Sequence, residues 1–538
     1  MQGQLFTQDF LVRGVVETEP WRAFPDADLD AFIISLRGIY RALTIETLLN
    51  EAQTESEVIE RVLGLLGWNE SWLSQVNLSE SGREDVPDYL LFPNPASKSR
   101  ALAEGSDDRR ARHGIVLLEA KRWLRVLDRS DDTHNGARKK FDFGAPSSQM
   151  LRYLSRADVM SDRAIKWGIL TNGAIWRLYW QDARSRAEDF FELDIATLIG
   201  VPGMQAQNEG FPLRHGLKLF FLIFHRAAFL AQPWDEHNRT YHAVALSEAR
   251  LYEEAVSQSL GARVFSELFP ELANALAASD LHATKDASGR YTRAYLEELR
   301  EASLILLYRL LFVFYAEDRA LLPVRDQRYV DYSLRQMRDD IADRRDHDRV
   351  FSSTAGNYWA RLINLFAIIS DGDDAVGMPA YNGGLFDRAR APILTRVRVP
   401  DSSLAPIIDA LSRRTEEESK ARINYRDLSV SHLGGIYERL LEYTLVEQGA
   451  VLVAHPASYA RKTTGSYYTH DDLVRLIINE SIGCLLDDIN GSSGSRFKHS
   501  IADRPSDLTN GMRLKMLIRQ RAYSILKSVT PQWVAGIF

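Results

Sequence analysis

At 538 residues, the chain is longer than one hydrophobic core usually supports, so its length predicts two to four domains. Its composition, 45% hydrophobic and 26% charged, is that of an ordinary globular protein. A formal net charge of -7 excludes a protein that coats nucleic acid by bulk basic charge, so any DNA contact must come from local patches.

The cysteine content and the apolar runs indicate the compartment. Cys484 is the single cysteine, which excludes an internal disulfide and a cysteine-rich zinc site and suits a reducing cytoplasm. Residues 1–17 mix charges throughout, so no amino-terminal signal peptide is expected. The most hydrophobic run, residues 304–316, is interrupted by Arg309 and is too short to span a bilayer. We therefore expect a cytoplasmic protein with no membrane partner.

The first elements expected in chain order are helices. A lead-in over residues 1–44 has apolar residues at helical spacing between residues 28 and 43, which predicts one helix there. Residues 55–63 predict a second helix, in a domain that we place at residues 45–200. Within that domain, residues 95–112 are rich in Ser, Ala, Arg and Asp and lack periodicity, so we expect a disordered excursion.

Three charged side chains stand at the ends of two predicted strands. Asp88 follows Pro87, which enforces extended backbone. A short aliphatic run ends in Glu119-Ala120-Lys121, which predicts a buried strand with two charges at its end. Because side chains alternate along a strand, Glu119 and Lys121 share one face, where Asp88 can meet them. Two carboxylates and an ammonium predict a divalent-metal site with a lysine beside the attacking water. The alternative is a surface salt bridge at a strand end.

This pattern resembles the PD-(D/E)XK nuclease family, spelled here Pro87-Asp88 and Glu119-Ala120-Lys121. The predicted order of helix, strand, strand, helix and strand is the core order of that fold. The last strand belongs to a hairpin expected over residues 167–179.

Two residues of the predicted second core helix extend the resemblance. Gln149 and Tyr153, one helical turn apart and so on one face, resemble the Gln-x-x-x-Tyr signature of the RecB-like branch. The resemblance implies that Asp88, Glu119 and the Ala120 carbonyl hold Mg²⁺, that Lys121 orients or deprotonates the water, and that Gln149 and Tyr153 position the scissile strand.

Residues 201–455 predict a helical connector domain. Glu317, Asp318 and Arg319 end one of its helices, and we interpret them as a helix-end ion pair over an apolar core rather than as a charged site. Its long amphipathic stretches cover residues 217–230, 249–277, 291–321, 331–344 and 357–369.

Residues 456–538 contain a second motif, in which a polar, glycine-containing loop opens a helix. His470-Asp471-Asp472 places carboxylates where the helix dipole favours them. The loop resembles motif X of gamma-class adenine-N6 DNA methyltransferases, which lines the S-adenosyl-L-methionine pocket, although His470 stands where that family usually has proline. The resemblance implies cofactor contacts by Thr464, Gly465, Ser466, Tyr468 and Thr469.

The two resemblances together give the layout of type IIG restriction-modification enzymes. The expected fold class is an α/β amino-terminal PD-(D/E)XK nuclease-like domain, then a mostly α-helical connector and the incomplete start of a methyltransferase domain. The layout implies a Mg²⁺-dependent, type II site-specific deoxyribonuclease that acts on double-stranded DNA in defence against foreign DNA. Methyl transfer by this chain is not expected, because neither a glycine-rich cofactor turn nor an Asn-Pro-Pro-Tyr-like segment follows motif X, and a target recognition domain is absent too.

The last residues predict a shifted reading frame. Residues 527–538, reverse-translated and read from the third base of each codon, permit Val-Cys-Asp-Pro-Ala-Met-Gly-Ser-Gly-His-Phe. That string resembles the family's cofactor-binding Asp-Pro-Ala-x-Gly-Ser-Gly turn. On this interpretation the chain is the truncated amino-terminal portion of a longer enzyme, and residues 528–538 are out of frame. The alternative is a short natural tail of low order.

Two other functions compete with the nuclease. One is an inactive or regulatory fragment that binds DNA or a partner chain, which could be a separate methyltransferase or target-recognition chain. The other is a nucleotide-driven motor, which is disfavoured because the sequence has no Gly-x-x-x-x-Gly-Lys-(Ser/Thr) loop.

Overall fold

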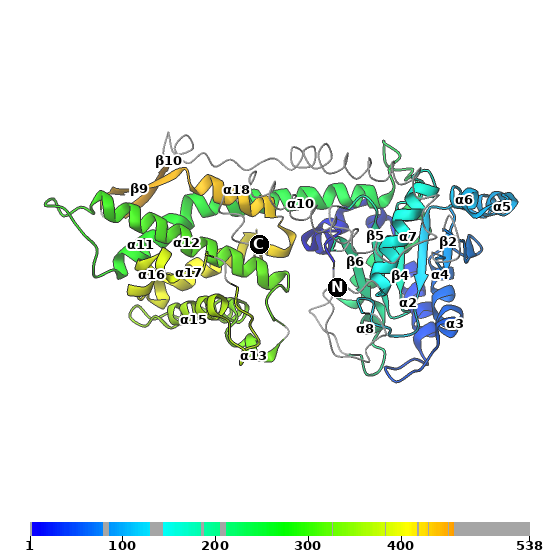
Figure 1. The fold of residues 1–538 in the computed structure, drawn as a ribbon, viewed down its shortest axis with the longest axis horizontal. Coiled ribbons are helices and arrows are strands. Elements are labelled where there is room, and N and C mark those ends of the chain that lie inside the picture. The colour runs from blue at the N-terminus through cyan, green and yellow to red at the C-terminus, as the bar shows by residue number, and fades with distance from the viewer. Residues whose placement is uncertain are drawn as a thin grey trace, which may run out of the picture. The chain divides into compact units, whose positions relative to one another are not determined.

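The chain divides into two compact units, Met1–Glu254 and Ala255–Phe538, each with its own hydrophobic core (Figure 1). The motif X residues and the tail expected to be out of frame lie outside the described residues. The computed structural model describes residues 3–78, 86–129, 144–183, 188–204, 211–324, 326–381, 384–416, 419–428, 430–449 and 451–456.

A six-stranded mixed sheet forms the centre of the first unit, with its strands in chain order across the sheet. The pair β3–β4 is parallel and the remaining neighbours are antiparallel. A parallel pair needs a crossover, and helix α7 (Pro146–Met160) lies between these two strands in the chain and packs on β4. The strands are β1 (Trp72–Ser74), β2 (Tyr89–Leu91), β3 (Val116–Ala120), β4 (Trp167–Thr171), β5 (Ile175–Trp180) and β6 (Phe190–Asp194).

Helices cover both faces of this sheet. On one face, Met150 and Leu154 of α7 share a core with Leu90 and Leu117 of the strands. On the other face, Leu118 and the other strand residues of opposite orientation pack among the amino-terminal helices. The helical elements of this unit are η1 (Phe10–Gly14), η2 (Val15–Glu17), α1 (Glu19–Ala23), α2 (Asp26–Tyr40), α3 (Glu51–Thr54), η3 (Glu55–Ile59), α4 (Glu60–Leu65), α5 (Pro95–Ala103), α6 (Asp107–Ala111), α7, α8 (Ile195–Ile199), α9 (Leu213–Phe224), η4 (Arg226–Phe229) and most of α10 (Tyr241–Arg263).

The first unit extends beyond the predicted range 45–200 at both ends. Leu36 of α2 and Leu217 of α9 are fully buried in the same core as the sheet residue Leu118. Both helices therefore complete the core that covers one face of the sheet.

The disordered excursion predicted over residues 95–112 is wrong, because α5 and α6 occupy it. The Asn94 side chain accepts a hydrogen bond from the Ser97 N–H, which caps α5. Ala101 and Ala111 are fully buried in the core that contains Leu90 and Leu117. Alanines carry little hydrophobic signal, so the sequence shows no period there, yet both helices contribute buried residues to this core.

The second unit is mostly helical, and α12 (Arg293–Asp318) runs through its core with Leu306 and Leu310 fully buried. Helices lie in the predicted stretches 249–277, 291–321, 331–344 and 357–369, which confirms those predictions. The other elements are η5 (Val264–Leu268), α11 (Phe269–Ser279), α13 (Gln327–Val330), α14 (Leu334–Asp346), α15 (Asn357–Asp371), η6 (Arg388–Arg390), α16 (Pro392–Arg396), α17 (Asp401–Ser412), η7 (Tyr425–Asp427), α18 (Val430–Leu440) and the hairpins β7 (Arg413–Glu416)–β8 (Ser419–Arg422) and β9 (Tyr443–Gln448)–β10 (Val451–Pro456).

The arginine that interrupts the apolar run of α12 is buried and paired. Arg309 donates to the Leu385 and Asp387 carbonyls at 2.8 and 2.9 Å, and its guanidinium lies over the Phe366 and Phe386 rings. In the part of the chain that the structure describes, no helix combines the length and apolar character needed to cross a membrane.

Candidate functional site

The antiparallel pairing of β2 and β3 brings Asp88 beside Glu119. Tyr89 is opposite Leu118, so Asp88, one residue earlier, falls opposite Glu119. The Ala120 N–H donates to Asp88 Oδ2 at 2.7 Å, which fixes this carboxylate at the strand end. Glu119 lies two residues after Leu117 and so belongs to the face of the sheet that α7 covers, whereas Asp88 lies in the bend just before β2.

Lys121 joins this pair through its side chain. Lys121 Nζ donates to Glu119 Oε1 at 2.5 Å and lies 3.6 Å from Glu51 Oε1. The salt bridge that the sequence offered as an alternative therefore exists. It is not a surface pair, because the Glu119 side chain is 2% exposed and that of Lys121 is 13% exposed.

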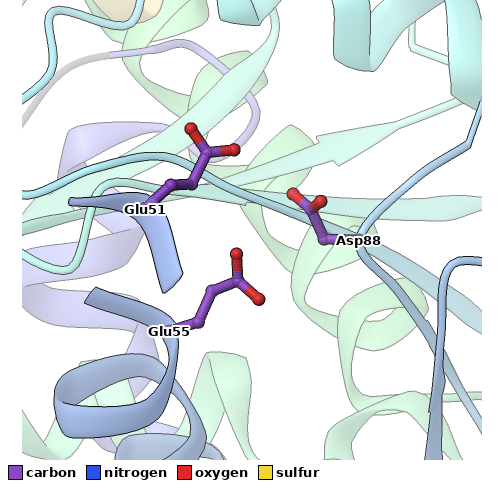
Figure 2. A group of neighbouring side chains, drawn as sticks. All are labelled: Glu51, Glu55 and Asp88. Carbon is purple, nitrogen blue, oxygen red and sulfur yellow. The ribbon is translucent and has the colours of Figure 1, made fainter. Parts of the chain in front are cut away.

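Glu51 and Glu55 approach Asp88 from the helical segment that α3 and η3 form (Figure 2). One carboxylate oxygen from each of these three residues lies within 4.8 Å of the other two. We call Glu51, Glu55 and Asp88 the three-carboxylate group. The capping box between Asn50 and Gln53 fixes where α3 starts and hence where the two glutamates stand.

Sequence reasoning missed both glutamates. Their spacing of four residues places them on one helix face, and that spacing was the available signal. It is a weak signal, because exposed helices often carry such pairs. Glu51 and Glu55 differ from other glutamates because their helical segment packs where both carboxylates lie beside Asp88.

In the described part of the chain, one oxygen of Glu119 is buried and meets no hydrogen-bond donor in bonding geometry. Oε1 accepts from Lys121, whereas Oε2 meets no hydrogen-bond partner among the described residues. Burial, and next the negative charge of Asp88, raises the pKa of Glu119 to about 8. Leaving a buried carboxylate oxygen without a hydrogen bond costs free energy, and a ligand that binds this oxygen would remove that cost.

The neighbouring groups have shifted pKa values for related reasons. Burial raises the pKa of Asp88, against the opposing effect of the Lys121 ammonium. Burial also raises the pKa of Glu55, against the hydrogen bond from Tyr89. Burial lowers the pKa of Lys121, but Glu119 outweighs it and the net shift is upward. Several carboxylates thus lie around one ammonium, and a bound cation would reduce the repulsion between their negative charges.

Gln149 and Tyr153 lie together on α7. Gln149 Nε2 is 2.6 Å from Tyr153 Oη, and the Tyr153 side chain is buried in the core between α7 and the sheet. Burial raises the pKa of Tyr153, and the charge of Glu119 is the next contribution, so the phenol lies within electrostatic reach of the site.

The other predicted site residues divide into two groups. Ala120 is fully buried and its N–H binds Asp88, so the metal contact predicted for its carbonyl stays a prediction. The predicted cofactor residues Thr464, Gly465, Ser466, Tyr468 and Thr469 lie outside the described residues.

Comparison with known proteins adds no relative. No family model matches the chain, and neither a curated protein nor a solved structure matches it. The functional argument therefore rests on the residues of the site.

Proposed function

We propose that the first unit is a Mg²⁺-dependent deoxyribonuclease that hydrolyses phosphodiester bonds of double-stranded DNA. The observation that carries the proposal is the buried Glu119 oxygen, which meets no donor in the described residues and belongs to a carboxylate that contacts Lys121. The three-carboxylate group lies beside it. The resemblance of Pro87-Asp88 and Glu119-Ala120-Lys121 to the PD-(D/E)XK pattern supports the same function.

The donor set fits a hard divalent cation. Mg²⁺ prefers oxygen ligands and is usually held by one or two carboxylates together with water and phosphate oxygens. Asp88 and Glu119 would hold it, and Glu51 and Glu55 offer further carboxylates at the same strand end. Bound Mg²⁺ would polarise a phosphoryl oxygen and offset the negative charge that DNA brings to the site.

The residues of the chain would position the reacting groups. Hydrolysis joins a water oxygen to phosphorus, breaks one bond between phosphorus and a deoxyribose oxygen, and in net terms moves one proton from the water to that leaving oxygen. The ammonium of Lys121 can donate a hydrogen bond to that water, since its Nζ lies between Glu119 and Glu51. Gln149 and Tyr153, which are hydrogen-bonded to each other, would position the scissile strand.

A cleavage assay with matched glutamate variants tests this function. Purified chain is incubated with unmethylated phage DNA, with Mg²⁺ or with a chelator. We expect cleavage that requires Mg²⁺ and falls at least about a hundredfold in Glu119→Ala. Glu57→Ala is the control, because Glu57 is an exposed glutamate on the same helical segment as Glu55 and should leave cleavage unchanged. Wild-type rates in the Glu119 variant would refute the nuclease.

We also propose that the nuclease belongs to a fused restriction-modification enzyme. The support is the order of the two motifs, with residues 464–469 similar to the methyltransferase element that lines the S-adenosyl-L-methionine pocket. Adding this cofactor together with a chain that supplies methyltransferase and target recognition should alter the site or rate of cleavage. Cleavage that is unchanged by both additions would contradict the assignment to a fused restriction-modification enzyme and would leave the nuclease proposal standing.

A further inference from the structure

The tyrosine that follows Asp88 contacts two carboxylates. Tyr89 Oη lies 2.8 Å from Glu55 Oε2 and 3.0 Å from Glu60 Oε1. In the part of the chain that the structure describes, this hydroxyl is the hydrogen-bond donor that reaches the Glu55 side chain. Glu55 therefore takes its orientation from a residue of β2 and not from its own helical segment.

The ring that carries this hydroxyl is firmly held. Tyr89 is 1% exposed, and its ring packs edge-on against Trp72 with 4.9 Å between the ring centres. Its backbone pairs with Ser74 on one side and Leu118 on the other. The hydroxyl of a ring held in this way offers one fixed donor position to the helical segment.

Two successive residues connect β2 to the site. Asp88, in the bend just before β2, carries one carboxylate of the three-carboxylate group, and Tyr89, the first residue of β2, reaches Glu55. A phenol has a single proton, so Glu60 competes with Glu55 for it. A carboxylate has two oxygens, and the bond to Tyr89 leaves the second oxygen of Glu55 available.

We propose that Tyr89 is a positioning residue of the metal site, whose hydroxyl orients the Glu55 carboxylate toward Glu51 and Asp88. The inference rests on the proposed function, because it assigns Glu55 to the metal. Without the hydroxyl, repulsion from the nearby carboxylates would turn Glu55 away, and the site would lose a preorganised ligand. Removing a residue that orients a metal ligand typically weakens metal binding about tenfold to a hundredfold.

Metal titration of the full chain without DNA measures this effect. Mn²⁺ is the probe, followed by loss of the electron paramagnetic resonance signal of the free ion and by competition with Mg²⁺. We expect Tyr89→Phe to weaken binding about tenfold. Tyr40→Phe is the matched control, because it removes a buried hydroxyl that binds the Gly173 carbonyl and no carboxylate. It should bind Mn²⁺ as the wild type does.

A double-mutant cycle separates positioning from a general loss of structure. In a Glu55→Gln chain, adding Tyr89→Phe should change Mn²⁺ affinity less than twofold, because the group through which Tyr89 acts is already altered. An equal loss in both backgrounds would overturn the inference, since a purely structural role is additive. The phenylalanine keeps the ring and its contact with Trp72, and circular dichroism checks that every variant is folded.

The outcomes also separate this inference from the proposed function. Wild-type chain that binds neither Mn²⁺ nor Mg²⁺ would refute both. Wild-type binding that Tyr89→Phe leaves unchanged would refute the role of Tyr89 alone and leave the nuclease standing.

Discussion

At the scale of single residues, Lys121 is a cation that pairs with carboxylates of the site. Its ammonium contacts Glu119 and lies near Glu51, two carboxylates that arrive from different elements. We expect Lys121→Met to reduce cleavage about a hundredfold or more, because the methionine keeps the shape but donates no hydrogen bond. Mn²⁺ binding should persist, since the carboxylates remain, and the titration described for Tyr89 checks it. Cleavage at the wild-type rate would show that hydrolysis needs neither the charge nor the hydrogen bonds of Lys121.

Glu317 differs from the helix-end ion pair expected of it. Its neighbour Asp318 does pair with the buried Arg338, at 2.6 Å. Glu317 instead accepts hydrogen bonds from the Tyr329 hydroxyl at 2.8 Å and from the N–H groups of Leu334 and Arg335 at 2.8 and 2.7 Å. Glu317 therefore caps the start of α14 from the end of α12, inside the core of the second unit.

This buried carboxylate predicts a pH-dependent stability. Burial raises the pKa of Glu317 from its ordinary 4.5 to about 7, against the hydrogen bond from Tyr329. The native state then holds a proton that the unfolded state releases, so the unfolding free energy falls as pH rises through this range, by up to roughly 3 kcal/mol. We expect Glu317→Gln to lower the unfolding free energy by about 2 kcal/mol at pH about 5 and to remove its decrease with rising pH. Urea unfolding of the wild type and the variant at pH about 5 and 8 measures both effects. An equal change of unfolding free energy with pH in the two chains would contradict the prediction.

At the scale of elements, α5 and α6 show how helices without an apolar period still fold. The cap at Asn94 begins α5, and buried alanines rather than large side chains join the core. We expect Ala101→Asp to destabilise the first unit by more than about 3 kcal/mol, because it buries an unpaired carboxylate. Ser99→Asp, on the exposed side of α5, should cost less than about 0.5 kcal/mol. Thermal unfolding compares the two, and equal midpoints would mean that α5 does not pack.

At the scale of the whole molecule, the two units have separate hydrophobic cores. The residues proposed for the nuclease, from Glu51 to Tyr153, all belong to the first unit. In the described part of the second unit, charged residues such as Glu317 and Arg309 make hydrogen bonds within the core.

The sequence by itself determined the elements whose side chains follow a strong period. The long amphipathic run of α12 and the short aliphatic run of β3 each admit one regular conformation, so both could be predicted, as could the shared face of Glu119 and Lys121. The hairpins β7–β8 and β9–β10 were not predicted, because cross-strand pairing does not show as a period along the chain.

Only the tertiary structure decided which carboxylates gather at the site. Asp88 reaches Glu119 through the register of β2 on β3, which the alternation of buried residues favours. Glu51 and Glu55 reach Asp88, and Tyr89 reaches Glu55, because the helical segment that carries both glutamates packs beside the start of β2. The position of that segment depends on how the whole core packs in three dimensions, and no spacing in the sequence encodes it.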